Sequence, residues 1–136
     1  MTKDQIESNL SQIKTCLEME TGDDVESKNE KLSQLITFIG LSSEILRYTK
    51  QLVLIKQGEI VKDNIDRKLP PTILKSLMES EMWLELGLNL YAERINAGIS
   101  HAITGLVTQI SLYKAELSAN MRESNNTFKW KQKNQN

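Results

Sequence analysis

The sequence predicts an all-α fold whose centre is a long antiparallel helical hairpin. Apolar residues recur at helical spacings over two long stretches, and the only two prolines, Pro70 and Pro71, lie between those stretches. A proline ends a helix at or before the residue that precedes it, and it suits the first turn of the next helix. We therefore expect one helix over about residues 27–66 and a second over about residues 72–119.

A short amphipathic helix with its turn should occupy residues 1–22, ahead of a hairpin core at residues 23–120. Its apolar stripe has spacings of four, three and four residues and consists of Ile6, Leu10, Ile13 and Leu17. Gly22 should end this helix, because glycine is the usual residue after a helix C-terminus. The carboxylates just after Gly22 lack the alternating spacing of a calcium loop, so we expect a solvated connection there.

The first long helix carries two apolar stripes. One stripe alternates spacings of three and four and consists of Phe38, Leu41, Ile45, Tyr48, Leu52 and Ile55. The other repeats every seven residues, about 100° around the helix from the first, and consists of Leu32, Ile39, Leu46, Val53 and Ile60. Because a helix in a simple hairpin needs only one such stripe, the two stripes predict two buried faces.

The second long helix repeats this pattern. Its apolar face consists of Leu77, Leu84, Leu88, Ile95, Ile99, Leu106, Ile110, Tyr113 and Leu117. The opposite, more mixed side consists of Trp83, Leu90, Arg94, Ala97, His101, Thr108 and Leu112. Between the two sides lie Gly87, Gly98 and Gly105, each of which costs about 1 kcal/mol of helix propensity relative to alanine. We interpret this line of glycines as a place where another helix approaches closely.

The long helices expose more apolar surface than one chain of this design can cover, because the N-terminal helix is only about 27 Å long. Copies of the same chain are the simplest partners, so we expect a homo-oligomer. The residues expected at surfaces between copies are Leu32, Ile39, Leu46, Val53, Ile60, Trp83, Leu90, Ala97 and Leu112. The alternative is that the long helices fold back at Gly58 or Gly87 to give a monomeric bundle of four or five helices.

Composition excludes several classes of protein. The 136 residues make one domain by length, and 17 basic against 18 acidic residues give a net charge of −1, which argues against a general polyanion binder. The single cysteine, Cys16, permits no internal disulfide, and the chain starts with an amphipathic segment, not an apolar signal. We therefore expect a cytoplasmic protein.

One stretch has the length of a membrane span. Residues 95–113 carry no Asp, Glu, Lys or Arg for 19 residues. The stretch nevertheless includes Asn96, Ser100, His101 and Gln109, which are too polar for lipid. A buried helix of a bundle is the better interpretation, and we expect no membrane span.

The C-terminal residues 121–136 read as a flexible basic and aromatic tail. Two rings alternate there with ammonium groups, in the residues Phe128, Lys129, Trp130, Lys131 and Lys133. Such residues bind single-stranded nucleic acid, because bases stack on the rings while lysines neutralise phosphates. The same pattern suits an acidic groove on a protein partner, and it also suits a tail that only increases solubility.

Arg94 and His101 lie two turns apart on the mixed side of the second long helix. An arginine and a histidine separated by four to six residues are typical of the HEPN family of helical ribonucleases, and Arg94-x6-His101 resembles that motif. The resemblance implies that His101 assists proton transfer at a ribose hydroxyl and that Arg94 holds the phosphate. The polar residue that usually comes after the arginine is replaced here by Ile95. The alternative is a structural histidine that is hydrogen-bonded inside a bundle, with Arg94 paired to Glu93 or to a neighbouring helix.

No other pattern predicts chemistry. One histidine and one cysteine cannot make a zinc site, and the chain has no phosphate loop, nucleophile elbow or dinucleotide motif. We therefore expect no cofactor, no metal and no catalysis. The sequence favours a non-enzymatic assembly or adaptor protein that self-associates and binds a protein partner. The alternative is an accessory protein that binds single-stranded nucleic acid, such as a recombination mediator of phage or bacterial origin.

Overall fold

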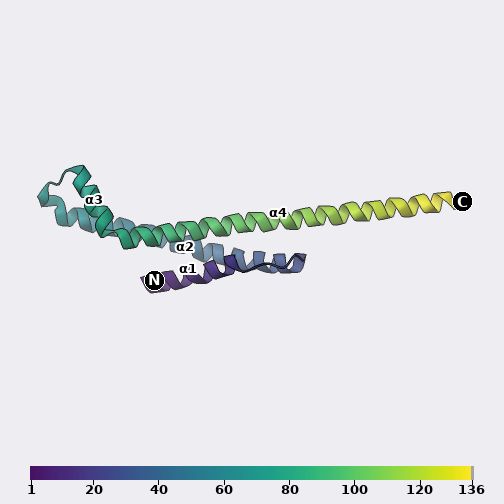
Figure 1. The fold of residues 1–136 in the computed structure, drawn as a ribbon, viewed down its shortest axis with the longest axis horizontal. Helices are drawn as coiled ribbons and strands as arrows, with labels where there is room; N and C mark the ends of the chain where they lie inside the picture. Colours follow the sequence, from purple (N-terminus) through teal and green to yellow (C-terminus); the bar gives the residue numbers. More distant parts are fainter. Residues whose placement is uncertain (136) are drawn as a thin grey trace.

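The computed structural model describes residues 1–135, which form helices and their connections without any strand. The predicted all-α class is confirmed. Four α-helices and one 3₁₀ turn succeed one another as α1 (Lys3–Glu18), α2 (Val25–Asn64), η1 (Ile65–Arg67), α3 (Pro71–Glu81) and α4 (Trp83–Asn134). The molecule is elongated, with α4 running through most of its length (Figure 1).

Local hydrogen bonds explain where the first two helices begin. Thr2 and Gln5 form a capping box at α1, in which each side chain accepts a hydrogen bond from the other residue's backbone N–H. Asp24 caps α2 by accepting a hydrogen bond from the Ser27 backbone N–H. A Cβ on Gly22 would lie 2.8 Å from the Asp24 carboxylate, so a larger residue here would force this capping carboxylate to shift. The constraint at Gly22 is therefore one of space and not of a left-handed backbone.

The predicted second long helix is wrong at both ends. It bends at Met82, whose backbone (φ −101°, ψ 6°) leaves the helical range, although hydrogen bonds from Met82 to Met78 and from Leu86 to Met82 continue across the bend. Met82 is only 4% exposed, so the bend turns this side chain inward. At the other end, α4 does not stop near residue 119 but continues to Asn134 through the segment expected to be a tail.

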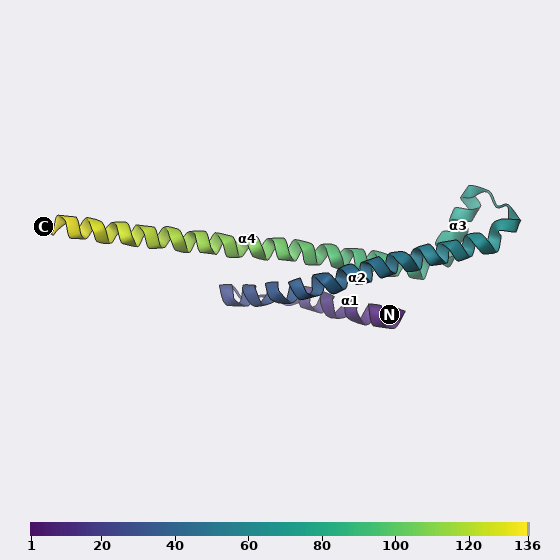
Figure 2. The same cartoon turned by 180° about the vertical axis from the view of Figure 1, so that it is seen from behind.

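Side-chain pairs fix how α2 and α4 lie together. Thr49 hydrogen-bonds Asn89 at 3.0 Å, and Ser42 hydrogen-bonds Asn96 at 3.2 Å. Residue numbers fall along α2 as they rise along α4, so the two helices are antiparallel. Both views of the ribbon show them side by side (Figures 1 and 2). The 40 residues of α2 span about 60 Å without a break at Gly58, and α4 passes Gly87 without a break, so neither helix folds back there.

The helix α1 completes a three-helix region along part of this pair. Lys3 contacts Glu85 at the start of α4, and Leu17 lies against Gly98, so α1 runs parallel to α4. The buried core draws on all three helices and includes Ile6, Leu10, Ile13, Cys16, Leu35, Ile45, Leu88, Ala92, Ile95, Ile99 and Leu106.

The two stripes of α2 both contact this core, and Ile45 of the first stripe is fully buried in it, whereas Ile55 of the same stripe is 59% exposed. The side chains along the midline between the stripes are also deeply buried, and they include Leu35, Ser42 and Thr49. The glycine prediction holds at one position only. A Cβ on Gly98 would lie 3.4 Å from Leu17, whereas a Cβ on Gly87 or Gly105 would meet nothing within 4 Å. Gly87 and Gly105 therefore do not mark a close approach of another helix within the described residues.

Candidate assembly surface

The C-terminal part of α4 leaves the three-helix region and continues alone. Every residue from Ser111 to Gln135 is exposed, because α1 ends at Glu18 and α2 begins only at Val25, near the level of Ile110 on α4. Both views show this part of the helix without a neighbour (Figures 1 and 2). We call residues 111–134 the α4 extension. Its 24 residues are about 36 Å long.

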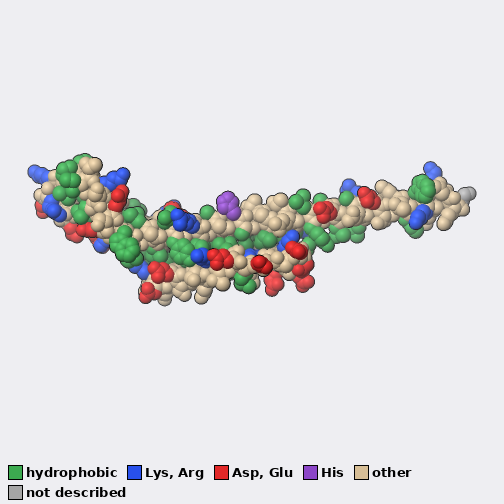
Figure 3. Space-filling model, viewed as in Figure 1, with side chains coloured by type: hydrophobic (Ala, Val, Ile, Leu, Met, Phe, Trp, Pro, Cys, Tyr) green, Lys and Arg blue, Asp and Glu red, His purple; other side chains and the backbone are tan. Residues whose placement is uncertain are grey.

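The buried face of α4 continues onto this extension. Leu106 and Ile110 are buried against the fold. Beyond them, at spacings of three, four, four and seven residues, the same face carries Tyr113, Leu117, Met121 and Phe128, which are 50%, 48%, 62% and 62% exposed. We call these four side chains the exposed stripe. Apolar side chains lie along the underside of the extension in the space-filling view (Figure 3).

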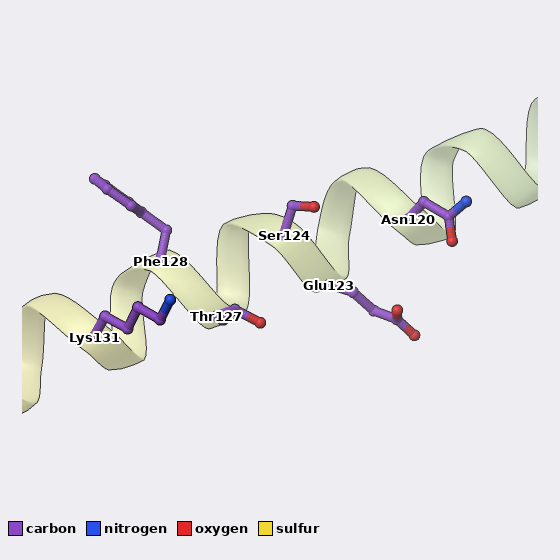
Figure 4. Close-up of a pocket in the computed structure, with 6 residues that line it drawn as sticks. All are labelled: Asn120, Glu123, Ser124, Thr127, Phe128 and Lys131. Carbon is purple, nitrogen blue, oxygen red and sulfur yellow. The ribbon is translucent and has the colours of Figure 1, made fainter.

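A shallow depression lies on this face near the end of the helix. Its lining comes from α4 alone and consists of Asn120, Glu123, Ser124, Thr127, Phe128 and Lys131. These side chains project from successive turns, with Phe128 standing out from the helix (Figure 4). Because one helix forms the only wall, the depression does not enclose a small ligand, and a second helix or chain would be needed to close it.

The helix separates the two aromatic rings that the sequence placed together. Phe128, Lys129, Trp130, Lys131 and Lys133 are all exposed on the last turns of α4. Residues two apart on a helix point in nearly opposite directions, so Phe128 and Trp130 do not form one stacking surface. Phe128 shares its face with Lys131, and Trp130 shares its face with Lys133. This arrangement differs from the continuous platform that binds successive bases of a single strand.

The residues predicted at surfaces between copies divide into two groups. On α2, Leu32, Ile39, Leu46 and Val53 are half-buried within the chain's own fold. Ile60 needs a correction, because this side chain is only 2% exposed and is already covered by the same chain. On α4 the predicted residues are exposed, and they are Trp83, Leu90, Ala97 and Leu112. The sequence periodicity predicts only half of the exposed stripe. It places Tyr113 and Leu117 on the apolar face, but the predicted helix ends before Met121 and Phe128.

Arg94 and His101 lie on the solvent side of α4, away from α1 and α2. Both are exposed, and neither side chain makes a hydrogen bond or an ion pair within residues 1–135. Within one chain, His101 is therefore not buried inside the bundle. The histidine side chain, drawn in purple, stands out from the surface of the molecule (Figure 3), and Arg94 is exposed as well, so the chain's own fold does not enclose the pair in a pocket.

Two carboxylates have perturbed pKa values. Burial acts to raise the pKa of Glu85, but the hydrogen bond from Lys3 at 2.9 Å and the nearby charge of Lys56 hold that pKa below its usual value. Hydrogen bonds from the Ser27 side chain and backbone lower the pKa of Asp24. Both groups support helix ends or contacts between helices, and neither lies on the α4 extension.

No metal-binding cluster accompanies the extension in the described chain. Across residues 1–135, no three His, Cys, Asp or Glu side chains come together as possible metal ligands. None of the helices described is long and apolar enough to cross a membrane. No protein-family model, no curated protein and no solved structure matches the chain.

Proposed function

We propose that the chain is a non-enzymatic assembly protein that self-associates through the α4 extension and presents the resulting helical scaffold to a protein partner. The observation that supports this best is the exposed stripe, which continues the buried face of α4 past the end of its own partner helices. A large apolar side chain contributes about 1.5–3 kcal/mol when it becomes fully buried. A face with four such side chains on a soluble chain favours contact with another protein surface.

The length of the extension supports the same proposal. A helix that stands alone in water is marginal, because its stability in proteins comes mostly from packing of its apolar face. The extension also contains Ser118, Asn120, Ser124, Asn125 and Thr127, which are weak helix formers. Partners along the exposed stripe would stabilise it as a helix.

The mass of the protein in solution tests this proposal. Light scattering behind size exclusion, at tens of micromolar chain, should give a mass that is a multiple of 15.5 kDa. A mass of 15.5 kDa across the whole concentration range would contradict the proposal.

The buried thiol of Cys16, which lies 3.5 Å from the Gln34 side chain, suits a reducing compartment, and we propose the cytoplasm.

The second candidate is binding of single-stranded nucleic acid at the end of the extension. The observation that favours it is charge, because residues 122–133 include four basic side chains and one acidic side chain. Such binding should weaken steeply with salt, as counterions are released from the phosphates. Fluorescence anisotropy of a labelled oligonucleotide tests it, and an unchanged signal at low salt with micromolar protein would exclude it.

A further inference from the structure

Charge is distributed unevenly along the molecule. Residues 18–30, the acidic segment, carry six acidic side chains and one basic side chain. Residues 122–133, the basic tip, carry four basic side chains and one acidic side chain. The acidic segment joins α1 to α2. Its end at the start of α2 lies level with the part of α4 where the exposed stripe begins, because α2 is antiparallel to α4 in the register given by the Ser42–Asn96 and Thr49–Asn89 contacts. The basic tip lies at the far end of the same helix.

A single copy cannot bring these two regions together. Ile110 and Lys131 are 21 residues apart on one unbroken helix, a separation of about 32 Å. That distance is several times the screening length of physiological salt, so the two regions do not interact within one chain. The space-filling view shows acidic side chains at the near end of the extension and basic ones at its tip (Figure 3).

We propose that two copies pair through their exposed stripes in an antiparallel, two-fold arrangement, which places the basic tip of each copy beside the acidic segment of the other. This inference rests on the proposed function and names its partner surface. A parallel pair would instead bring the two basic tips together and the two acidic segments together. Opposite charges favour the antiparallel register, and like charges disfavour the parallel one.

The arrangement also fits the path of α2. The N-terminal end of α2 at Val25 leaves the face of α4 uncovered from about Tyr113 onward. In the antiparallel pair, the extension of the second copy packs on the side of α4 that α2 covers, just beyond the N-terminal end of α2. There it covers Tyr113, Leu117, Met121 and Phe128. A two-fold pair uses the same surface on both copies and closes without further addition.

Two matched double variants test the stripe. Leu117→Glu with Met121→Glu places charge on the exposed stripe, whereas Ala115→Glu with Ala119→Glu places the same charge on the opposite side of the same turns. All four positions are exposed, so neither variant disturbs the core of the chain. Sedimentation equilibrium should give twice 15.5 kDa for the wild type and for the alanine-site variant, and 15.5 kDa for the stripe variant.

These masses separate the two proposals. A wild type that remains a single chain contradicts the proposed function as well as this inference. A wild type that associates into trimers or larger species contradicts only the two-fold pair. A stripe variant that remains a dimer also contradicts the inference. So does an equal weakening of the dimer by the stripe variant and the alanine-site variant. Neither result contradicts self-association itself.

Charge reversal tests the register. Lys131→Glu with Lys133→Glu changes the net charge of the basic tip from +3 to −1. Asp23→Lys with Glu26→Lys and Glu30→Lys changes the net charge of the acidic segment from −5 to +1 without touching the Asp24 cap. Each variant alone should dimerise at least ten-fold more weakly than the wild type. A 1:1 mixture should recover the dimer, because a pair with one copy of each variant has opposite charges at both contacts. A mixture that stays monomeric contradicts the proposal.

Spin labels give the orientation directly. With Cys16→Ala and a label at Gln132→Cys, the antiparallel pair should separate the two labels by about 30 Å, and a parallel pair would hold them much closer. Short label distances would overturn the proposal. A variant of the basic tip that dimerises like the wild type but no longer binds a labelled oligonucleotide would also overturn the proposal. The basic tip would then bind nucleic acid and not the acidic segment of a second copy.

Discussion

Asn96 on α4 donates a hydrogen bond from its side-chain amide to the hydroxyl of Ser42 on α2 across 3.2 Å. Ser42 is fully buried, and the same amide also reaches Ser43 at 3.2 Å. Thr49 and Asn89 repeat the contact one heptad further along. Two polar layers therefore cross an otherwise apolar seam. Because a shift of one turn would take the Asn96 amide away from the buried Ser42 hydroxyl, the polar layers favour the observed register of α2 against α4.

The Ser42–Asn96 contact should show strong coupling between its two residues. Asn96→Ala leaves the Ser42 hydroxyl in the seam without its partner, and we expect a loss of about 1–2 kcal/mol in the free energy of unfolding. The double variant Ser42→Ala with Asn96→Ala removes both polar groups, and its loss should be smaller than the sum of the losses of the two single variants. Urea unfolding followed by circular dichroism measures the cycle. Additive effects of the two substitutions would contradict a shared polar layer.

The contact between Lys3 and Glu85 should make docking of α1 depend on pH. The folded chain lowers the pKa of Glu85 below its ordinary value of 4.5, so this stabilisation is present above pH 4.5 and is lost as the pH falls through the lower, folded value. Lys3 is partly exposed and screened, so Lys3→Ala should cost about 1 kcal/mol or less at pH 7.

Thermal unfolding of Glu85→Gln at a series of pH values measures this effect. The variant should be less stable than the wild type at pH 7, and the difference should shrink as the pH falls below 4.5. Glu79→Gln removes an exposed carboxylate from α3 and serves as the control, with no such change in the difference. A deficit for Glu85→Gln that is the same at pH 7 and pH 3 would point to packing and not to charge.

Two glycines should respond in opposite ways to alanine. A Cβ at Gly105 meets nothing within 4 Å, so Gly105→Ala should stabilise the helix by about 0.5–1 kcal/mol. A Cβ at Gly22 would lie 2.8 Å from the Asp24 carboxylate and 2.9 Å from the Ser27 hydroxyl, so Gly22→Ala should weaken the cap of α2. Melting temperatures of the two variants check both signs. A destabilising Gly105→Ala would mean that another helix approaches there.

Local periodicity predicted the buried face of α1 correctly, and it failed on the long helices, where tertiary contacts decide which side chains are buried. The spacing of Ile6, Leu10 and Ile13 predicted the buried face of α1 correctly, because one stripe on a short helix has one way to pack. The buried positions of Ser42 and Thr49 were missed, since a hydroxyl between two apolar stripes looks like an exposed residue until its partner is known.

The C-terminal segment shows the same limit at the candidate site. Residues 120–134 have few apolar side chains, and no local signal distinguishes a tail from the continuation of a long helix. Once the helix is known, Met121 and Phe128 fall on the face that Leu106 and Ile110 bury. Periodicity over residues 106–128 contained this stripe, but it becomes visible only when the helix is extended past residue 119.

The two ends of the α4 face should differ sharply in their effect on stability. Ile99 is fully buried in the core with α1 and α2, so Ile99→Ala should cost about 2–5 kcal/mol through lost burial and a cavity. Leu117 is 48% exposed on the same face beyond the three-helix region, and in the single chain Leu117→Ala should change the free energy of unfolding by less than about 0.5 kcal/mol. Urea unfolding of both variants, at a concentration where the mass is known, measures the difference. A large loss for Leu117→Ala at low concentration would show that this side chain is covered within one chain, and the boundary between the core and the α4 extension would then lie further along the helix.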